Sequence, residues 1–125
     1  MIHLDTSALV ASLCGTRTAA PMLRGFVADG IRLGVSTLVL YEWLRGPRVA
    51  QELAAQELLF PRGNAFGFGA EEAALAADLY RRLPRPRHRE IDLAIAACAI
   101  NNGAALWTTN PRDFADIPGL TLADG

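Results

Sequence analysis

Four acidic side chains stand at positions where a carboxylate could take part in chemistry. Asp5 directly follows the apolar run 2–4, and Asp113 lies shortly after the mostly apolar run 104–108. Ligands of parallel sheets gather at the carboxyl ends of the strands, so both residues fit such a site. Each also has a local interpretation: Asp5 could cap the next helix, and 110–113 (Asn-Pro-Arg-Asp) has the composition of a helix start. Position alone leaves both interpretations open for Asp5 and favours the cap for 110–113.

Asp92 carries a stronger physical argument, because it lies in the segment 91–100, which is apolar on nearly every side. A helix of that kind is expected to be buried. Burying a carboxylate costs several kcal/mol unless it is paired or bound to a cation, and the helix dipole offsets only about 0.3–1 kcal/mol. We therefore expect a partner for Asp92, either Arg89 or a metal ion.

Glu42 raises the same question with less force. Leu38 and Val39 precede it on the same predicted helix, and Arg45 follows three positions later. An ordinary ion pair at that spacing contributes only a few tenths of a kcal/mol. The surroundings of Glu42 therefore leave a structural and a functional role equally open.

Four carboxylates brought together would repel one another unless a cation compensated them. Hard oxygen ligands suit Mg²⁺ or Mn²⁺, and such an ion can activate water and stabilise charge on a phosphodiester. Other acidic-site classes are excluded by composition: receiver domains and haloacid-dehalogenase-type phosphatases need a lysine, and all twelve cationic side chains are arginine. A P-loop is also absent. His3 and His88 are far apart; we expect a packed strand residue and an exposed loop residue, not an acid–base pair.

The composition is that of an ordinary globular protein. The chain has 125 residues, which we treat as one domain (1–125); 51% are hydrophobic and 20% charged, with a formal net charge of −1. No apolar run approaches the roughly 20 residues that cross a membrane, and the start lacks the features of a signal peptide. Cys14 and Cys98 lie in apolar patterns and are expected to be small buried residues in a reducing compartment. We therefore expect a cytoplasmic protein.

The elements that must position these acids alternate along the chain. Predicted strands lie at 2–5, 31–35, 65–68 (weak, because of its glycines), 104–108 and 120–122. Predicted helices lie at 7–13, 18–29, from Ser36 or Thr37 to Arg45, 48–59, 71–83, 90–101 and 111–114. Gly46-Pro47 and Asn102-Gly103 are strong helix ends. This alternation predicts an α/β sandwich with a mostly parallel sheet.

The motifs, in this order, resemble those of PIN-domain nucleases, specifically VapC-type toxins of toxin–antitoxin pairs. The matching segments are Ile2-His3-Leu4-Asp5-Thr6-Ser7, 36–42 (Ser-Thr-Leu-Val-Leu-Tyr-Glu), 92–97 (Asp-Leu-Ala-Ile-Ala-Ala), 106–114 (Leu-Trp-Thr-Thr-Asn-Pro-Arg-Asp-Phe) and 117–120 (Ile-Pro-Gly-Leu). Each is weak alone, but together they span essentially the whole chain. The departures, a glycine-containing third strand at 65–68 and Trp107 in place of an aliphatic residue, leave the four acids untouched.

The resemblance implies a PIN-like, Rossmann-like α/β/α fold with a central, mostly parallel sheet of four to five strands. It implies an endoribonuclease that holds Mg²⁺ or Mn²⁺ and cleaves structured RNA (tRNA or rRNA), leaving a 5′-phosphate and a 3′-hydroxyl. Asp5 and Asp92 would be the main metal ligands, and Asp113 and Glu42 would complete the site directly or through water. The side chains that would orient them are Thr6, Thr108 and Asn110.

The resemblance also implies partners. A cognate antitoxin would neutralise the enzyme, which would form a homodimer and, with antitoxin, a heterotetramer or larger assembly. The region of Tyr41, Trp43 and Leu44 would adjoin the antitoxin groove, although core packing is the expected role for most of these residues. A basic stretch could be an RNA-phosphate track or a solvated helix end; its members are Arg81, Arg82, Arg85, Arg87 and Arg89. The alternatives are a PIN nuclease of RNA maturation and a nuclease-dead binding module, and the four intact acids count against the module.

Overall fold

The fold is built on a short parallel sheet at the centre of the molecule. A computed structural model describes residues 1–15 and 17–123. The strands are β1 (Ile2–Leu4), β2 (Leu33–Gly34) and β3 (Ala105–Trp107), in the order β2-β1-β3 with both pairs parallel. All three residues of the central strand β1 are buried, as expected of a parallel strand covered on both faces. The predicted α/β fold with a parallel sheet is confirmed.

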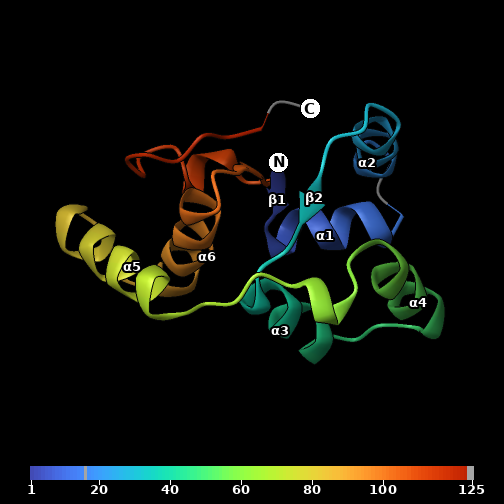
Figure 1. Ribbon diagram of the computed structural model, residues 1–125, viewed down its shortest axis with the longest axis horizontal. Helices are drawn as coiled ribbons and strands as arrows, with labels where there is room; N and C mark the ends of the chain where they lie inside the picture. Colours follow the sequence, from blue (N-terminus) through green and yellow to red (C-terminus); the bar gives the residue numbers. More distant parts are fainter. Residues whose placement is uncertain (16, 124–125) are drawn as a thin grey trace.

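Six α-helices and two short 3₁₀ turns surround this sheet in the described residues. Figure 1 shows α5 and α6 on one side of the strands and α1, α2 and α4 on the other. The helices are α1 (Thr6–Leu13), α2 (Ala19–Ala28), α3 (Thr37–Arg45), α4 (Ala50–Leu59), α5 (Ala70–Arg82) and α6 (Glu90–Asn101); the turns are η1 (Arg62–Asn64) and η2 (Pro111–Asp113). None of these helices combines the length and the apolar composition that a membrane crossing requires.

Local sequence signals set several helix ends. Ser36, rather than Thr37, caps α3, because its hydroxyl accepts a hydrogen bond from the Val39 amide at 3.3 Å. Gly103 follows the end of α6 in the left-handed conformation (φ 63°), which glycine adopts without steric penalty. The predicted ends of these helices therefore agree with the structure to within about a residue.

The core forms where the apolar faces of the helices meet the strands. Residues 93–99 of α6 are all buried, as the sequence predicted. Trp43 and Leu79 contribute fully buried side chains from α3 and α5. Trp107 of β3 is also buried and packs edge-on against Phe26, with ring centroids 5.3 Å apart. The unusual aromatic at position 107 is therefore a core residue.

Two predicted strands are reduced to isolated bridges, which leaves three strands rather than four or five. Phe66 pairs only with Ser36, and Leu122 only with Leu106. The Phe66 segment contains Gly67, and glycine weakens a strand because it has no side chain to pack. Phe66 itself is held by its ring, which lies 4.7 Å from that of His3. A Cβ atom on Gly34 would lie 2.6 Å from the same ring, so a glycine is required there.

The remaining predictions had mixed outcomes. Cys98 is buried as expected, but Cys14, the residue that follows the last turn of α1, is exposed. His3 is buried and His88 is exposed, as predicted. The predicted helix at 111–114 is the 3₁₀ turn η2.

Candidate active site

Asp5 lies at the carboxyl end of β1 and is 5% exposed. Its Oδ1 accepts hydrogen bonds from the Ala8 amide at 2.9 Å and from the Ser7 hydroxyl at 2.7 Å. Its Oδ2 accepts a hydrogen bond from Thr108 Oγ1 at 2.6 Å. Both interpretations of Asp5 are therefore satisfied in the structure: it caps α1, and it lies at the strand end where a site would form.

Thr108 connects the ends of two neighbouring strands. It follows β3, and besides donating to Asp5 its Oγ1 accepts a hydrogen bond from the Asn110 amide at 3.0 Å. Ser7 has a similar bridging position, because its Oγ also accepts a hydrogen bond from the Thr109 amide at 3.1 Å. Sequence reasoning assigned no role to Ser7. A hydroxyl two residues after an acidic N-cap is a recognisable turn signal, and it could have indicated this contact.

Glu42 reaches the same region from α3. Thr6 donates its hydroxyl proton to Glu42 Oε1, and Arg45 Nη2 lies 3.5 Å from Oε2. The ion pair foreseen in the sequence is therefore present, and its arginine is largely exposed. Since an exposed pair at this spacing stabilises little, the Thr6 hydrogen bond is the contact that orients Glu42 relative to the end of β1.

Asp92 lies in the first turn of α6 and is half-buried, less deeply than predicted. Within residues 1–15 and 17–123 its carboxylate has no hydrogen bond and no ion pair. Burial raises the pKa of Asp92, and so does charge repulsion from Asp5, Asp113 and Glu42, while Arg89 opposes these effects. Of the two partners expected for Asp92, Arg89 or a metal ion, Arg89 does not pair with it, because that guanidinium binds Asp116 at 2.6 Å. The three other predicted acids therefore act on the charge of Asp92, which has no directly paired cation in the described residues.

Asp113 and Asn110 approach from the turn after β3. The Asp113 amide donates to the Asn110 carbonyl at 3.0 Å, but the Asn110 side chain does not cap the turn. Asn110 is nevertheless the N-cap residue of η2, with a proline in its first turn, so the predicted helix start is confirmed and only a side-chain capping hydrogen bond is absent. Both side chains are exposed, and in the described residues neither has a side-chain hydrogen bond that would withhold it from a ligand.

The donor set suits a hard divalent cation, because it consists of carboxylate oxygens flanked by hydroxyl groups. Burial and then repulsion from the other three acids raise the pKa of Asp92, and a bound cation would relieve that repulsion. In the described part of the chain, however, no three acidic, histidine or cysteine side chains are placed to hold one ion together. The residues thus fit a metal by chemistry, and their side chains would have to turn towards it.

The arginine stretch consists of four exposed arginines and one that is largely buried in an ion pair. Asp78 lies 3.6 Å from Arg81 and 3.2 Å from Arg82, and Arg89 is paired with Asp116. Arg85 and Arg87 lie in the exposed connection between α5 and α6. Arg81 and Arg82 remain 73% and 56% exposed despite these pairs, whereas Arg89 is 19% exposed, so four of the five arginines face solvent.

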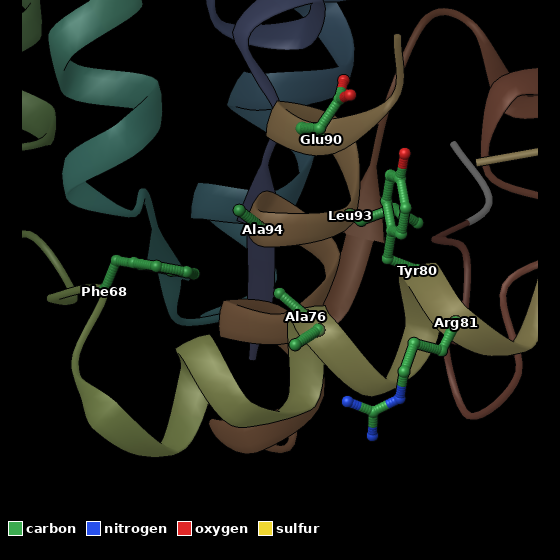
Figure 2. A pocket seen from close by; sticks show the side chains of 8 residues that line it. Phe68, Ala76, Tyr80, Arg81, Glu90, Leu93 and Ala94 are labelled. Atoms are coloured by element: carbon green, nitrogen blue, oxygen red, sulfur yellow. The ribbon is translucent and has the colours of Figure 1, made fainter. Parts of the chain in front are cut away.

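Apolar surface is exposed in two regions of the described chain. A groove of about 350 Å³ runs between α5 and α6; Figure 2 shows Ala76 and Tyr80 beside Leu93 and Ala94, with Glu90 at the rim. The α3–α4 patch is the second surface, and its exposed members are Tyr41, Leu44, Leu53, Leu58 and Leu59. Core packing, expected for most of the Tyr41 region, is correct for Trp43 and wrong for Tyr41 and Leu44.

Comparison with known proteins gives concordant results. The family model described as PIN domain matches residues 2–120. Ribonuclease VapC19 of Mycobacterium tuberculosis (strain ATCC 25618 / H37Rv) is 36% identical over 120 residues, covering 94% of each chain.

Solved structures agree in fold. DNA-bound VapBC from Salmonella typhimurium superposes with a TM-score of 0.81 at 23% identity, over 98% of this chain and 96% of that one. VapBC2 from Rickettsia felis, bound to a promoter DNA fragment, gives a TM-score of 0.75 at 23% identity, over 100% of this chain and 99% of that one. A toxin–antitoxin complex from Klebsiella pneumoniae gives a TM-score of 0.74 at 24% identity, over 97% of this chain and 96% of that one.

Proposed function

The chain belongs to the PIN-domain family, and we propose that it is a metal-dependent endoribonuclease that acts as the toxin of a VapC-type toxin–antitoxin pair. The ribonuclease relative, 36% identical over nearly its whole length, supports the activity. The observation that carries the proposal is the electrostatic state of Asp92: burial raises its pKa, and so does repulsion from three further carboxylates that lie after β1, on α3 and on η2. Such repulsion is typical of a site that receives a cation.

Each acidic residue has a distinct role in this proposal. Asp5 and Asp92 are the principal ligands of Mg²⁺ or Mn²⁺, and Asp113 with Glu42 completes the site. When bound, the ion would offset the carboxylate charge and act as a Lewis acid towards water and the phosphodiester. The hydroxyls of Ser7 and Thr108 hold the Asp5 carboxylate, and Thr6 holds that of Glu42. Asn110, whose amide nitrogen is bound to Thr108, lies where its side chain can orient water or a neighbouring carboxylate.

The reaction proposed is hydrolysis within an RNA strand. Water attacks the phosphorus, the bond to the 3′-oxygen breaks, and a proton passes to that oxygen, which leaves a 5′-phosphate and a 3′-hydroxyl. The substrate class is structured RNA such as tRNA or rRNA. Arg81, Arg82, Arg85 and Arg87 have exposed guanidinium groups that can contact its phosphates, whereas Arg89 is 19% exposed and bound to Asp116.

The test is cleavage of a tRNA and rRNA panel by purified protein, free of antitoxin, with Mg²⁺, Mn²⁺ or EDTA. We expect metal-dependent fragments with 5′-phosphate ends, and no cleavage by Asp92→Asn. Asp29→Asn is the matched control, because Asp29 is an exposed acid at the end of α2, away from the site. Cleavage by Asp92→Asn at the wild-type rate would overturn the metal-nuclease mechanism. RNA binding without any cleavage would instead favour a nuclease-dead binding module.

The toxin role is tested in cells. We propose that a cognate antitoxin covers the α3–α4 patch, whose exposed apolar side chains adjoin Glu42, and that the toxin is dimeric within a heterotetramer or larger complex. The VapBC composition of the structurally similar complexes supports this assignment. Expression in the cytoplasm of a host should arrest growth, and co-expression of the antitoxin should restore it. Normal growth with an active nuclease would favour a role in RNA maturation.

A further inference from the structure

Arg89 has an unusual environment for an arginine of this chain. Its side chain is 19% exposed, whereas the arginines of the other ion pairs in the described residues, at Arg45, Arg62, Arg81 and Arg82, are 56–73% exposed. Nη2 lies 2.6 Å from Asp116 Oδ1, and Nη1 lies 2.9 Å from Oδ2. This is a bidentate pair, the arrangement that fixes direction as well as distance.

The same guanidinium also holds two backbone carbonyls. Nη2 donates to the Asp113 carbonyl at 2.9 Å, and Nη1 donates to the Arg85 carbonyl at 3.3 Å. A guanidinium has four Nη–H donors. In Arg89 the two Nη nitrogens donate hydrogen bonds to three different residues. Asp113 is held through its backbone, and its carboxylate is left free for a ligand.

Little else fixes the direction of the segment that carries Asp113. The amides of Asp113, Phe114 and Ile117 bond only to carbonyls three residues earlier. Phe114 and Ile117 anchor the segment in the core, being 2% and 4% exposed, but apolar packing is not directional. The Arg89 hydrogen bonds therefore determine how residues 111–116 face the first turn of α6, where Asp92 lies.

We propose that Arg89, with Asp116 as its counter-ion, is a positioning residue that clamps the Asp113 segment against the start of α6. This proposal rests on the proposed nuclease function for its consequence in catalysis, but the clamp itself is a property of the free protein. This positioning role differs from the phosphate-binding role that the sequence predicted for Arg89. The Nη–H groups that would bind a phosphate already donate to protein acceptors. Lysine cannot replace the residue, because an ammonium group is a point charge without the planar fork.

The clamp is tested with Arg89→Lys, Arg89→Gln, Asp116→Ala and the double variant Arg89→Gln/Asp116→Ala. Each single variant should lower kcat about 10-fold, the usual effect of losing an outer-shell contact, with KM within about twofold of wild type. The double variant should be no slower than either single one, because both break one interaction. Mn²⁺ affinity, measured by calorimetry without RNA, should fall in parallel with kcat.

Hydrogen exchange gives a readout that is independent of activity. In metal-free protein, the amides of residues 113–117 should exchange faster in all four variants than in wild type. Asn101→Ala is the matched control: it removes a 2.9 Å hydrogen bond to Glu72 at the opposite end of α6 and should leave exchange at 113–117 and kcat unchanged. Melting temperatures identify any variant that fails to fold. If Arg89→Gln does not fold, Arg89→Lys is the conservative variant that replaces it in the comparison.

Contrary outcomes are distinct. A rise in KM for Arg89→Gln, with wild-type KM and exchange in Asp116→Ala, would mean that Arg89 binds RNA phosphate and would overturn the clamp. Wild-type exchange in all four variants would overturn it as well. A wild-type protein that cleaves no RNA would contradict the proposed function, while the exchange experiment would still decide the clamp.

Discussion

Two halves of the acidic cluster are held in different ways. Asp5 and Glu42, the fixed half, have hydrogen bonds to their own carboxylates from Ser7, Thr108 and Thr6. Asp92 and Asp113, the free half, have no such donors in the described residues, and their backbones are positioned by α6 and by Arg89. A hydrogen-bonded carboxylate has a fixed direction, whereas an unbonded one retains its charge and its lone pairs for a ligand. The site thus combines orientation in one half with unmet charge in the other.

The largest effect expected from this difference comes from neutralising one acid in each half. Asp5→Asn and Asp92→Asn should both reduce RNA cleavage by about a thousandfold, roughly 4 kcal/mol of transition-state stabilisation. Their effects on metal-free stability should be opposite. Asp5→Asn loses charge-assisted hydrogen bonds and should lower Tm by roughly 5 to 10 °C, whereas Asp92→Asn removes repulsion and should raise Tm. Calorimetric melting in EDTA checks both, and a fall in Tm for Asp92→Asn would contradict the comparison.

A smaller effect should follow from removing the hydroxyl that orients the fixed half. Thr108→Val deletes the donor that lies 2.6 Å from Asp5 Oδ2, and we expect about a 10-fold loss of kcat with about 1 kcal/mol less stability. Thr109→Val is the control, since the exposed Thr109 contributes only its backbone amide to the network. Equal kcat values for the two variants would show that Asp5 does not depend on this donor.

The free half should also respond to pH and to metal. A raised pKa means that the folded chain holds the Asp92 proton more tightly than the unfolded chain, so stability from this group is lost as the pH rises from 3.8 through the raised value. The difference in unfolding free energy, Asp92→Asn minus wild type, should therefore grow over this pH range. Added Mn²⁺ at neutral pH should make that difference negative. Urea unfolding at several pH values checks this; a pH-independent difference would contradict it.

His3 must be separated from this effect. Burial lowers the pKa of His3 from 6.5 to about 4. The contribution of His3 to the free energy of unfolding therefore decreases as the pH falls from about 6.5 towards 4. The two groups act in opposite directions on overlapping pH ranges. Because His3 is present in both proteins, its contribution cancels in the difference between wild type and Asp92→Asn.

The smallest effect concerns the loop that leads into the free half. His88 has a left-handed backbone (φ 64°) immediately before Arg89, a conformation that costs a non-glycine residue about 1 kcal/mol or more. His88→Gly should raise the melting temperature by a few degrees at most and leave kcat unchanged. A loss of kcat in this variant would show that the loop, and not Arg89 alone, positions the start of α6.

The sequence predicted the features that depend on neighbouring residues. The periodicity of residues 91–100 predicted a buried helix, and the helix ends at Ser36, Gly46 and Gly103 follow from caps and turns within a few positions. The motif order predicted the family, which the comparisons confirm, and placed all four acids in one site. That site assignment stays a prediction, although the effect of the other three charges on Asp92 supports it.

Tertiary structure decided the contacts between distant residues. Arg89 lay within reach of Asp92 by sequence, yet it pairs with Asp116, 27 positions away. The side chains of the motif at 110–113 make no capping hydrogen bond. Tyr41 is exposed, whereas Trp43, two positions later, is buried. Helix periodicity and caps follow from local geometry, whereas the choice among competing ion-pair partners depends on which elements the fold brings together. The sequence by itself therefore determined which acidic residues are the candidates for the site, and only the fold determined which of their carboxylates are hydrogen-bonded and which remain free.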